Sequence, residues 1–241
     1  MCGIAGLVAK KPLTREQFDK FLRVWSLQEL RGTQASGIII YFNDGRILFS
    51  KMPIKASEHA KTIAKLTLPY HKITMILAHA REATQGTPYN NENNHPLYHY
   101  LNGRLITLVH NGVIYATHER VRTVDSDALF YFIRKNNRFD DETMIQTFSQ
   151  IDGMRAVIVG DGNVMYFFRD VNPLEYVETN DFIVLASDYL DKVFTEAKPT
   201  QVKPHVLFKV EDGTIKEVRE IVESYYGYYG RYNRNYLNPY M

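Results

Sequence analysis

Cysteine is almost absent from this sequence, which holds a single one, Cys2, in 241 residues. One cysteine cannot form a disulfide within the chain, and its scarcity agrees with a reducing compartment. Long apolar runs are absent as well, since no stretch approaches the roughly 18 residues that span a bilayer. The apolar stretch 4–9 is too short for a signal peptide and follows no basic segment. We therefore expect a soluble, cytoplasmic protein without a membrane partner.

An excess of charge of one sign is also missing. Lysine and arginine total 29 and aspartate and glutamate 27, so the net charge of +2 gives no electrostatic reason to expect a nucleic-acid partner. Neither a glycine-rich phosphate-binding loop nor a second domain can be found. The composition that is present, 45% hydrophobic and 23% charged, is ordinary for a globular protein and is enough to bury a core.

The hydrophobic pattern predicts an α+β protein. Strands are expected in antiparallel pairs, as hairpins over 36–51 and 154–169 and as strands over 2–9, 73–80, 105–110, 176–186 and 205–218. Helices are expected in separate blocks, over 14–30 (with a capping box of Thr14 and Gln17), 56–67, 125–136, 140–150 and 188–196. This arrangement favours layered sheets and helices over an alternating doubly wound sheet. Residues 82–104 lack periodicity, and so long a loop inside a domain is usually functional or disordered.

We expect one domain over residues 1–220 and a tail over residues 221–241. The stretch "SYYGYYGRYNRNYLNPYM" holds seven of the 17 tyrosines and almost no aliphatic residues, which is typical of low complexity. Tyrosine and arginine favour protein interfaces, so the tail could dock a partner. A disordered end would explain the same composition equally well.

The position of Cys2, directly after the initiator Met1, suggests a chemical role. If Met1 is removed, the thiol and a free α-amine belong to one residue. An α-amine has an unperturbed pKa near ~8, so a useful fraction is unprotonated near neutral pH and can take the thiol proton. Nucleophile and base then stand on one residue, as in N-terminal threonine catalysis. The alternative is a small residue that happens to stand there.

Four further segments contain residues that are suited to binding or catalysis but also have simpler structural interpretations. Arg31 in "LRGTQASG" is a basic residue before a glycine, as at an ordinary helix end. Arg81 follows a buried strand, where its guanidinium could bind a carboxylate or be solvated in a loop. Asn111 and Gly112 could donate to an oxyanion or form a turn. Asp125 could hold an ammonium group or cap a helix.

Together these segments resemble the class II glutamine amidotransferase domain, a branch of the N-terminal-nucleophile hydrolases. The family patterns C-G-I, R-G-x-x-x-x-G, H-T-R-x-A-T-x-G, N-x-H-P, H-N-G and T-D-S-E correspond, in order, to "CGIAG", "RGTQASG", "HAREATQG", "NNHPL", "HNGVIYA" and "VDSDA". Most of these motifs are weak alone, but the ordered set is a strong signal over residues 2 to about 130. The resemblance implies the four-layer αββα sandwich of the N-terminal-nucleophile hydrolase type.

The resemblance also implies a role for each matching residue. Cys2 would attack the side-chain amide carbon of L-glutamine, with its own α-amine moving the proton. Asn111 and Gly112 would form the oxyanion hole. Arg81 would bind the substrate α-carboxylate and Asp125 the α-ammonium group. Hydrolysis of the acyl-enzyme would give glutamate and ammonia, with no cofactor and no metal.

Three more residues would support this pocket. Thr84 and Gly86 would line it, and Arg31 would support the site near Cys2. Departures from the family pattern fall at four positions that affect pocket shape and communication with a partner more than the nucleophile: Gln34, Glu82, Gln85 and Asp127.

Well-known members of the family fuse this domain to a synthase, transferase or synthetase that uses the ammonia. No such domain follows in this sequence, so the resemblance implies a stand-alone glutaminase that supplies a separate synthase or ligase. Two alternatives stay open: an N-terminal-nucleophile hydrolase of another amide, and a catalytically silent binding module of the same fold. Arg81 and Asp125 together favour a free amino acid, which has two charged ends, over a peptide-like amide.

Overall fold

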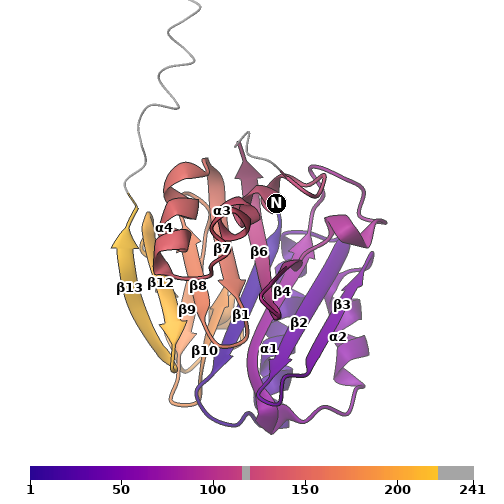
Figure 1. The fold of residues 1–241 in the computed structure, drawn as a ribbon. Helices are drawn as coiled ribbons and strands as arrows, with labels where there is room; N and C mark the ends of the chain where they lie inside the picture. The colour runs from indigo at the N-terminus through magenta and orange to yellow at the C-terminus, as the bar shows by residue number, and fades with distance from the viewer. Residues whose placement is uncertain (116–119, 222–241) are drawn as a thin grey trace, which may run out of the picture.

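The computed structural model describes residues 1–115 and 120–221 of the chain. Two antiparallel sheets face each other, and a pair of helices covers the outer face of each one (Figure 1). The layers therefore run helices, sheet, sheet, helices. This is the expected α+β, four-layer αββα sandwich, in which every sheet face is buried against another layer.

The first sheet carries the N-terminus in its centre. It has seven strands in the order β11-β9-β10-β1-β4-β2-β3, with bounds β1 Gly3–Ala9, β2 Ala35–Phe42, β3 Ile47–Met52, β4 Ile73–Arg81, β9 Glu175–Glu178, β10 Phe182–Ala186 and β11 Thr200–Gln201. Helices α1 (Arg15–Leu27) and α2 (Ala56–Ala64) cover its outer face. The predicted capping box of Thr14 and Gln17 starts α1, whose buried side chains include Phe18 and Trp25.

The second sheet has six strands in the order β13-β12-β8-β7-β6-β5. Their bounds are β5 Leu97–Leu101, β6 Arg104–Ile114, β7 Gly153–Gly160, β8 Met165–Arg169, β12 Val206–Glu211 and β13 Thr214–Glu220. Helices α3 (Tyr131–Asn136) and α4 (Asp141–Gln150) cover its outer face. The side chain of Asp140 accepts from the backbone N–H of Thr143 and caps α4, as expected.

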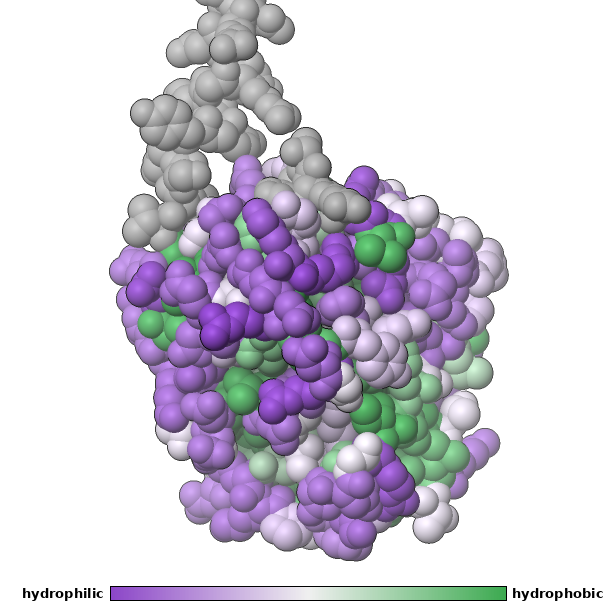
Figure 2. Space-filling view, in the orientation of Figure 1, coloured by the Kyte–Doolittle hydropathy of each residue, from purple (hydrophilic) through white to green (hydrophobic). Residues whose placement is uncertain are grey.

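Apolar side chains from both sheets form the central core. Ile4, Leu77, Val109, Ile158 and Phe167 are among its members, and each is fully buried. Burying one such side chain contributes roughly 1.5–3 kcal/mol, so this interface fixes the sheets against each other. The face of the molecule in Figure 2 is mostly hydrophilic, with apolar side chains in separate patches, as expected when the apolar residues gather in the cores.

Two expectations about secondary structure are wrong. The predicted loop 82–104 contains the edge strand β5, which pairs with β6 through Leu97 and Leu101. The predicted helix 188–196 is only a short 3₁₀ turn, Leu190–Lys192. Tyr189 has a φ of 72°, and this left-handed backbone conformation prevents a regular helix from starting earlier.

The packed region continues to the last residue described at its C-terminal end. Ile221 is 2% exposed, and its N–H donates to the carbonyl of His205 at 2.7 Å. Apart from Ile221, the predicted tail 221–241 lies outside the described residues. Within the described part of the chain, no helix combines the length and the apolar character needed to cross a membrane.

Candidate active site

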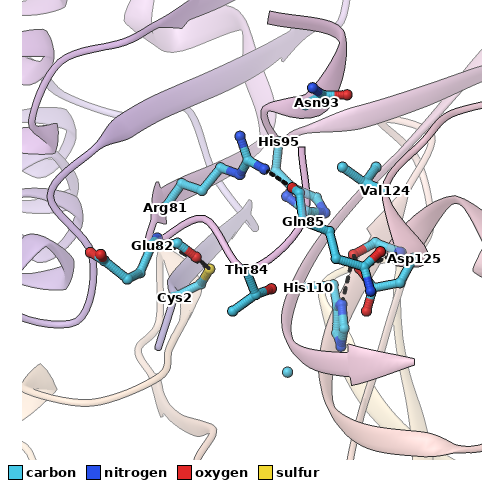
Figure 3. Close-up of a pocket in the computed structure, with 12 residues that line it drawn as sticks. Cys2, Arg81, Glu82, Thr84, Gln85, Asn93, His95, His110, Val124 and Asp125 are labelled. Atoms are coloured by element: carbon cyan, nitrogen blue, oxygen red, sulfur yellow. Dashed lines mark hydrogen bonds between the residues drawn. The ribbon is translucent and has the colours of Figure 1, made fainter. Parts of the chain in front are cut away.

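A pocket lies where β1, β4 and β6 come together (Figure 3). Five of the eight predicted site residues line it: Cys2, Arg81, Thr84, Gly112 and Asp125. Arg81 and Asp125 lie on opposite sides of Thr84 in this view. The pocket thus combines a thiol, a guanidinium and a carboxylate contributed by segments that are far apart in the sequence.

Cys2 stands immediately before β1, and strand pairing sets its position. Gly3 pairs with Ala80 in β4, which brings Cys2 beside the end of that strand. The Sγ atom lies 3.4 Å from both the backbone N and the carbonyl O of Glu82. Burial raises the pKa of the Cys2 thiol, and the backbone contact with Glu82 offsets only part of that effect. The thiol is therefore protonated at neutral pH and needs a base to become a nucleophile.

Arg31 holds the backbone of the nucleophile. It follows a 3₁₀ turn, Gln28–Leu30, that ends the first helical segment, and its Nε donates to the carbonyl of Cys2 at 3.0 Å. Gly3 lets this 3₁₀ turn pack against the start of β1, since a Cβ there would lie 2.6 Å from the Cβ of Gln28. Met1, in contrast, is 74% exposed. The terminal methionine is thus accessible while the residue behind it is fixed.

Arg81, at the end of β4, is 4% exposed and holds the loop that follows it. Its Nη1 donates to Asn94 Oδ1 at 2.7 Å and to the Thr87 carbonyl at 3.3 Å. Its Nη2 donates to the carbonyls of Gln85 and Gly86. Gly86 therefore does not line the pocket but is fixed by the guanidinium that does. Both terminal nitrogens of Arg81 donate to the loop. Motif matching did not reveal that Arg81 holds the loop in place.

Asp125 begins a 3₁₀ helix, Asp125–Phe130, and is 6% exposed. Its Oδ2 accepts from the backbone N–H of Ile114 at 2.7 Å, and its Oδ1 accepts from that of Ser126 at 2.9 Å. These bonds fix the carboxylate at the pocket wall. They also tie the start of the 3₁₀ helix to the end of β6.

Asn111 and Gly112 belong to β6 and not to a turn. Asn111 is 1% exposed, and no acceptor in the described residues bonds its Nδ2. Gly112 has a φ of 142°, and a Cβ at this position would lie 1.7 Å from the carbonyl oxygen of Met154. A buried amide donor with no partner beside a glycine that lines the pocket is suited to stabilising a negative oxygen on a ligand.

Three buried histidines pack together at the wall of the pocket. The rings of His79 and His95 lie 4.4 Å apart, and His79 Nε2 is 3.1 Å from the carbonyl of His110. His110 Nδ1 contacts Ser126 Oγ at 2.8 Å. Burial lowers the pKa of His79 to about 3 and lowers the pKa of His95 and His110, so all three are neutral near pH 7. His95 and His110 also line the pocket.

Gln34 and Glu82, which both depart from the family pattern, join neighbouring loops beside Cys2. Gln34 Oε1 accepts from the backbone N–H of Ala83 at 2.7 Å. Glu82 Oε2 accepts from the backbone N–H of Thr33 at 3.3 Å. The two side chains thus link segments 33–34 and 82–83 in both directions, and the second of these segments contacts the thiol.

A third departure, Asp127, holds the segment next to the pocket wall. Its side chain is fully buried, and its carboxylate contacts Arg122 at 2.8 Å and Arg134 at 3.2 Å. It also accepts from the backbone N–H of Val121 at 2.7 Å. These opposite charges outweigh burial and lower the pKa of Asp127. Asp127 is therefore a structural anion and not a pocket residue.

Solved structures share this fold. The glutamine phosphoribosylpyrophosphate (PRPP) amidotransferase from B. subtilis complexed with ADP and GMP has a TM-score of 0.66 at 19% identity, over 90% of this chain and 48% of that one. An allosteric regulatory enzyme of purine biosynthesis gives a TM-score of 0.69 at 20% identity, over 90% and 48% of the two chains. A glutamine aminotransferase class-II domain protein from Silicibacter pomeroyi gives 0.61 at 13% identity, over 92% and 100%. The chain thus spans about half the length of the first two structures.

These likenesses assign the fold to the N-terminal-nucleophile hydrolase type of sandwich. No curated protein matches the sequence. Residues 31–177, more than half of the chain, match the family described as "Glutamine amidotransferases class-II". The chain belongs to the class II glutamine amidotransferases.

Proposed function

We propose that this protein hydrolyses the side-chain amide of L-glutamine, with Cys2 as the nucleophile once Met1 has been removed. The observation that supports this most directly is the shared pocket of Cys2, Arg81 and Asp125. A thiol that shares a pocket with a fixed cation and a fixed anion suits a substrate with a reactive side chain and two charged ends. The family match supports an amidotransferase. Cys2 is the proposed nucleophile, and the two charged side chains are the basis for proposing glutamine as the substrate.

Binding of glutamine would exchange contacts at Arg81. The guanidinium now donates to neutral loop carbonyls, among them that of Gly86 at 3.1 Å. A carboxylate forms shorter and roughly twice as strong hydrogen bonds with arginine, so the α-carboxylate of the substrate would replace some of these acceptors. Asp125 would accept the α-ammonium group, and Thr84 would line the pocket between them. Loop 82–96 would then adjust around the bound amino acid.

The chemistry would proceed in two stages. The α-amine of Cys2 takes the thiol proton while Sγ bonds to the amide carbon, and the carbonyl oxygen becomes negative beside Asn111 Nδ2 and the Gly112 N–H. The carbon–nitrogen bond then breaks, and the α-ammonium returns the proton to the departing ammonia. Water next attacks the thioester, giving its proton to the amine and then to Sγ. The products are glutamate and ammonia.

The ammonia would pass to a separate synthase or ligase. The first two matching structures are about twice as long as the stretch they share with this chain. We place both proteins in the cytoplasm. We assign residues 1–220 to the amidotransferase domain together with Ile221, which is 2% exposed, and the rest of 221–241 to a tail.

An intact-mass measurement tests the proposal. The purified protein is incubated with a diazo-ketone analogue of glutamine, which alkylates a nucleophilic cysteine in a glutamine-shaped site. We expect a mass that lacks Met1 and carries one adduct, with no adduct in Cys2→Ala. A retained Met1 without adduct would contradict the enzyme and favour a silent binding module. Loss of Met1 without adduct, together with cleavage of a blocked amide but not of glutamine, would identify a different amide hydrolase.

A further inference from the structure

We infer that Asn172 is a positioning residue of this site, which holds the Asn111–Gly112 peptide so that the Gly112 N–H faces the substrate. The inference rests on the proposed function, in which Asn111 and Gly112 stabilise the oxyanion. Asn172 lies in the connection between β8 and β9 and does not line the pocket. It therefore acts through the backbone of β6 and not by touching the ligand.

One hydrogen bond carries the argument. Asn172 Nδ2 donates to the carbonyl oxygen of Asn111 at 2.9 Å, across 61 positions of sequence. This carbonyl and the Gly112 N–H belong to one planar, trans peptide unit, so they point in opposite directions. Fixing the carbonyl on the side of Asn172 therefore fixes the N–H on the other side.

The pairing of β6 with β7 leaves this N–H available. Gly112 is opposite Arg155 in the register of the two strands. Arg155 turns both of its backbone groups to Asp170: its N–H donates to Asp170 Oδ1, and its carbonyl accepts from the Asp170 N–H at 3.0 Å. Arg155 consequently does not take the Gly112 N–H as a ladder partner. The N–H therefore lies on the side away from β7, and its direction follows from how the Asn111 carbonyl is held.

The backbone at Gly112 needs such support. Its φ of 142° lies in a region that residues with side chains rarely adopt. A Cβ there would lie 2.6 Å from Asn172 Nδ2 as well as against Met154. Asn172 can thus approach β6 this closely only because position 112 has no side chain.

The connection that presents Asn172 is itself rigid. Asp170, two residues earlier, forms a buried ion pair with Arg155 at 2.7 Å. Arg169 Nη1 donates to the carbonyls of Asp170 and Asn172 at 3.4 and 3.5 Å. Pro173 follows directly and restricts the backbone of Asn172 to extended conformations. Asn172 therefore approaches Asn111 from a fixed direction, as a positioning group must.

The test compares Asn172→Asp and Asn172→Ala with the wild type. Aspartate keeps the shape but replaces the donor with an oxygen that repels the Asn111 carbonyl. We expect kcat for glutamine to fall at least tenfold at a nearly unchanged KM, since losing a direct oxyanion donor costs roughly 10²–10³. Glutamate γ-semialdehyde, which adds the Cys2 thiol across its carbonyl, should bind more weakly by a similar factor. The product glutamate, which forms no tetrahedral adduct, should bind as before.

Asn163→Asp is the matched control, because it adds the same charge in the turn at the far end of the β7–β8 hairpin. It should leave kcat, KM and the binding of both ligands unchanged. All rates are expressed per site alkylated by the diazo-ketone, so that misfolded protein does not count. Values of kcat within twofold of the wild type in both Asn172 variants would overturn the positioning role alone. A wild type that neither turns over glutamine nor reacts with the diazo-ketone would overturn the proposed function and this inference with it.

Discussion

The buried ion pair of Arg155 and Asp170 should be a major determinant of stability. The two side chains are 1% and 3% exposed, and Nε lies 2.7 Å from Oδ2. Asp170→Asn keeps the size of the side chain and an oxygen for the backbone N–H of Arg155, but it removes the negative charge that faces the guanidinium. Breaking a buried pair costs about 3–5 kcal/mol, because the remaining charge stays buried and loses the attraction of its partner.

The surroundings of Arg155 indicate the lower end of that range. Its guanidinium also donates to the carbonyls of Phe148 and Ile151 and lies 4.9 Å from the ring centre of Phe168. These contacts remain after the substitution and retain part of the stabilisation of the cation. For a protein of this size, about 3 kcal/mol corresponds to a fall of roughly 6 to 12 °C in the melting temperature.

Differential scanning calorimetry and urea titration at pH 7 measure the effect. Asp191→Asn is the matched control, because Asp191 and Lys192 form a pair at 3.1 Å whose side chains are 57% and 65% exposed. An exposed pair contributes about 0–1 kcal/mol, so this variant should stay close to the wild type. Equal stability losses in the two variants would refute the reasoning from burial.

Two further predictions concern the glycine of the oxyanion hole and the protonation of a core histidine. Gly112→Ala should lower kcat at least a hundredfold, because its Cβ would lie 1.7 Å from the Met154 carbonyl oxygen; steady-state kinetics near the wild-type rate would contradict this. Burial lowers the pKa of His59 from 6.5 to about 4, where it contacts Ser36 Oγ and Ser50 Oγ. Its neutral form thus stabilises the fold above pH 6.5, and this contribution should be lost as the pH falls toward 4. Urea midpoints between pH 7 and 4.5 should fall less in His59→Gln than in the wild type, and parallel curves would contradict the assignment.

Elements specified by nearby residues could be predicted from the sequence. The turn at 43–45 separates two β-rich runs, and the capping box of Thr14 and Gln17 starts α1 as expected. Strand β5 was not predicted because it is an edge strand with exposed aromatic positions, such as Tyr100 at 67% exposure. The failure at 188–196 has a tertiary cause. Glu175 Oε1 accepts from the N–H of Leu190 at 2.8 Å and holds the segment in a short turn.

The candidate site also contains some residues that could be predicted from the sequence and some contacts that could not. Cys2, Arg81, Gly112 and Asp125 belong to motifs, and the structure brings them to one pocket. Contacts made by backbone atoms leave no pattern in the sequence. The carbonyls that surround Arg81 and the bond from Asn172 to Asn111 therefore became visible only in the fold.

The central position of β1 has a consequence for biosynthesis. This strand is translated long before β10, yet Ala5 pairs with Ala186 in β10 on one side and with Ala78 in β4 on the other. At about 5–20 residues per second, roughly 10 to 40 s pass before β10 has been translated. Such a high contact order favours slow folding. During that interval β1 lacks its partner on one side, so that edge of the strand stays open until β10 has been made.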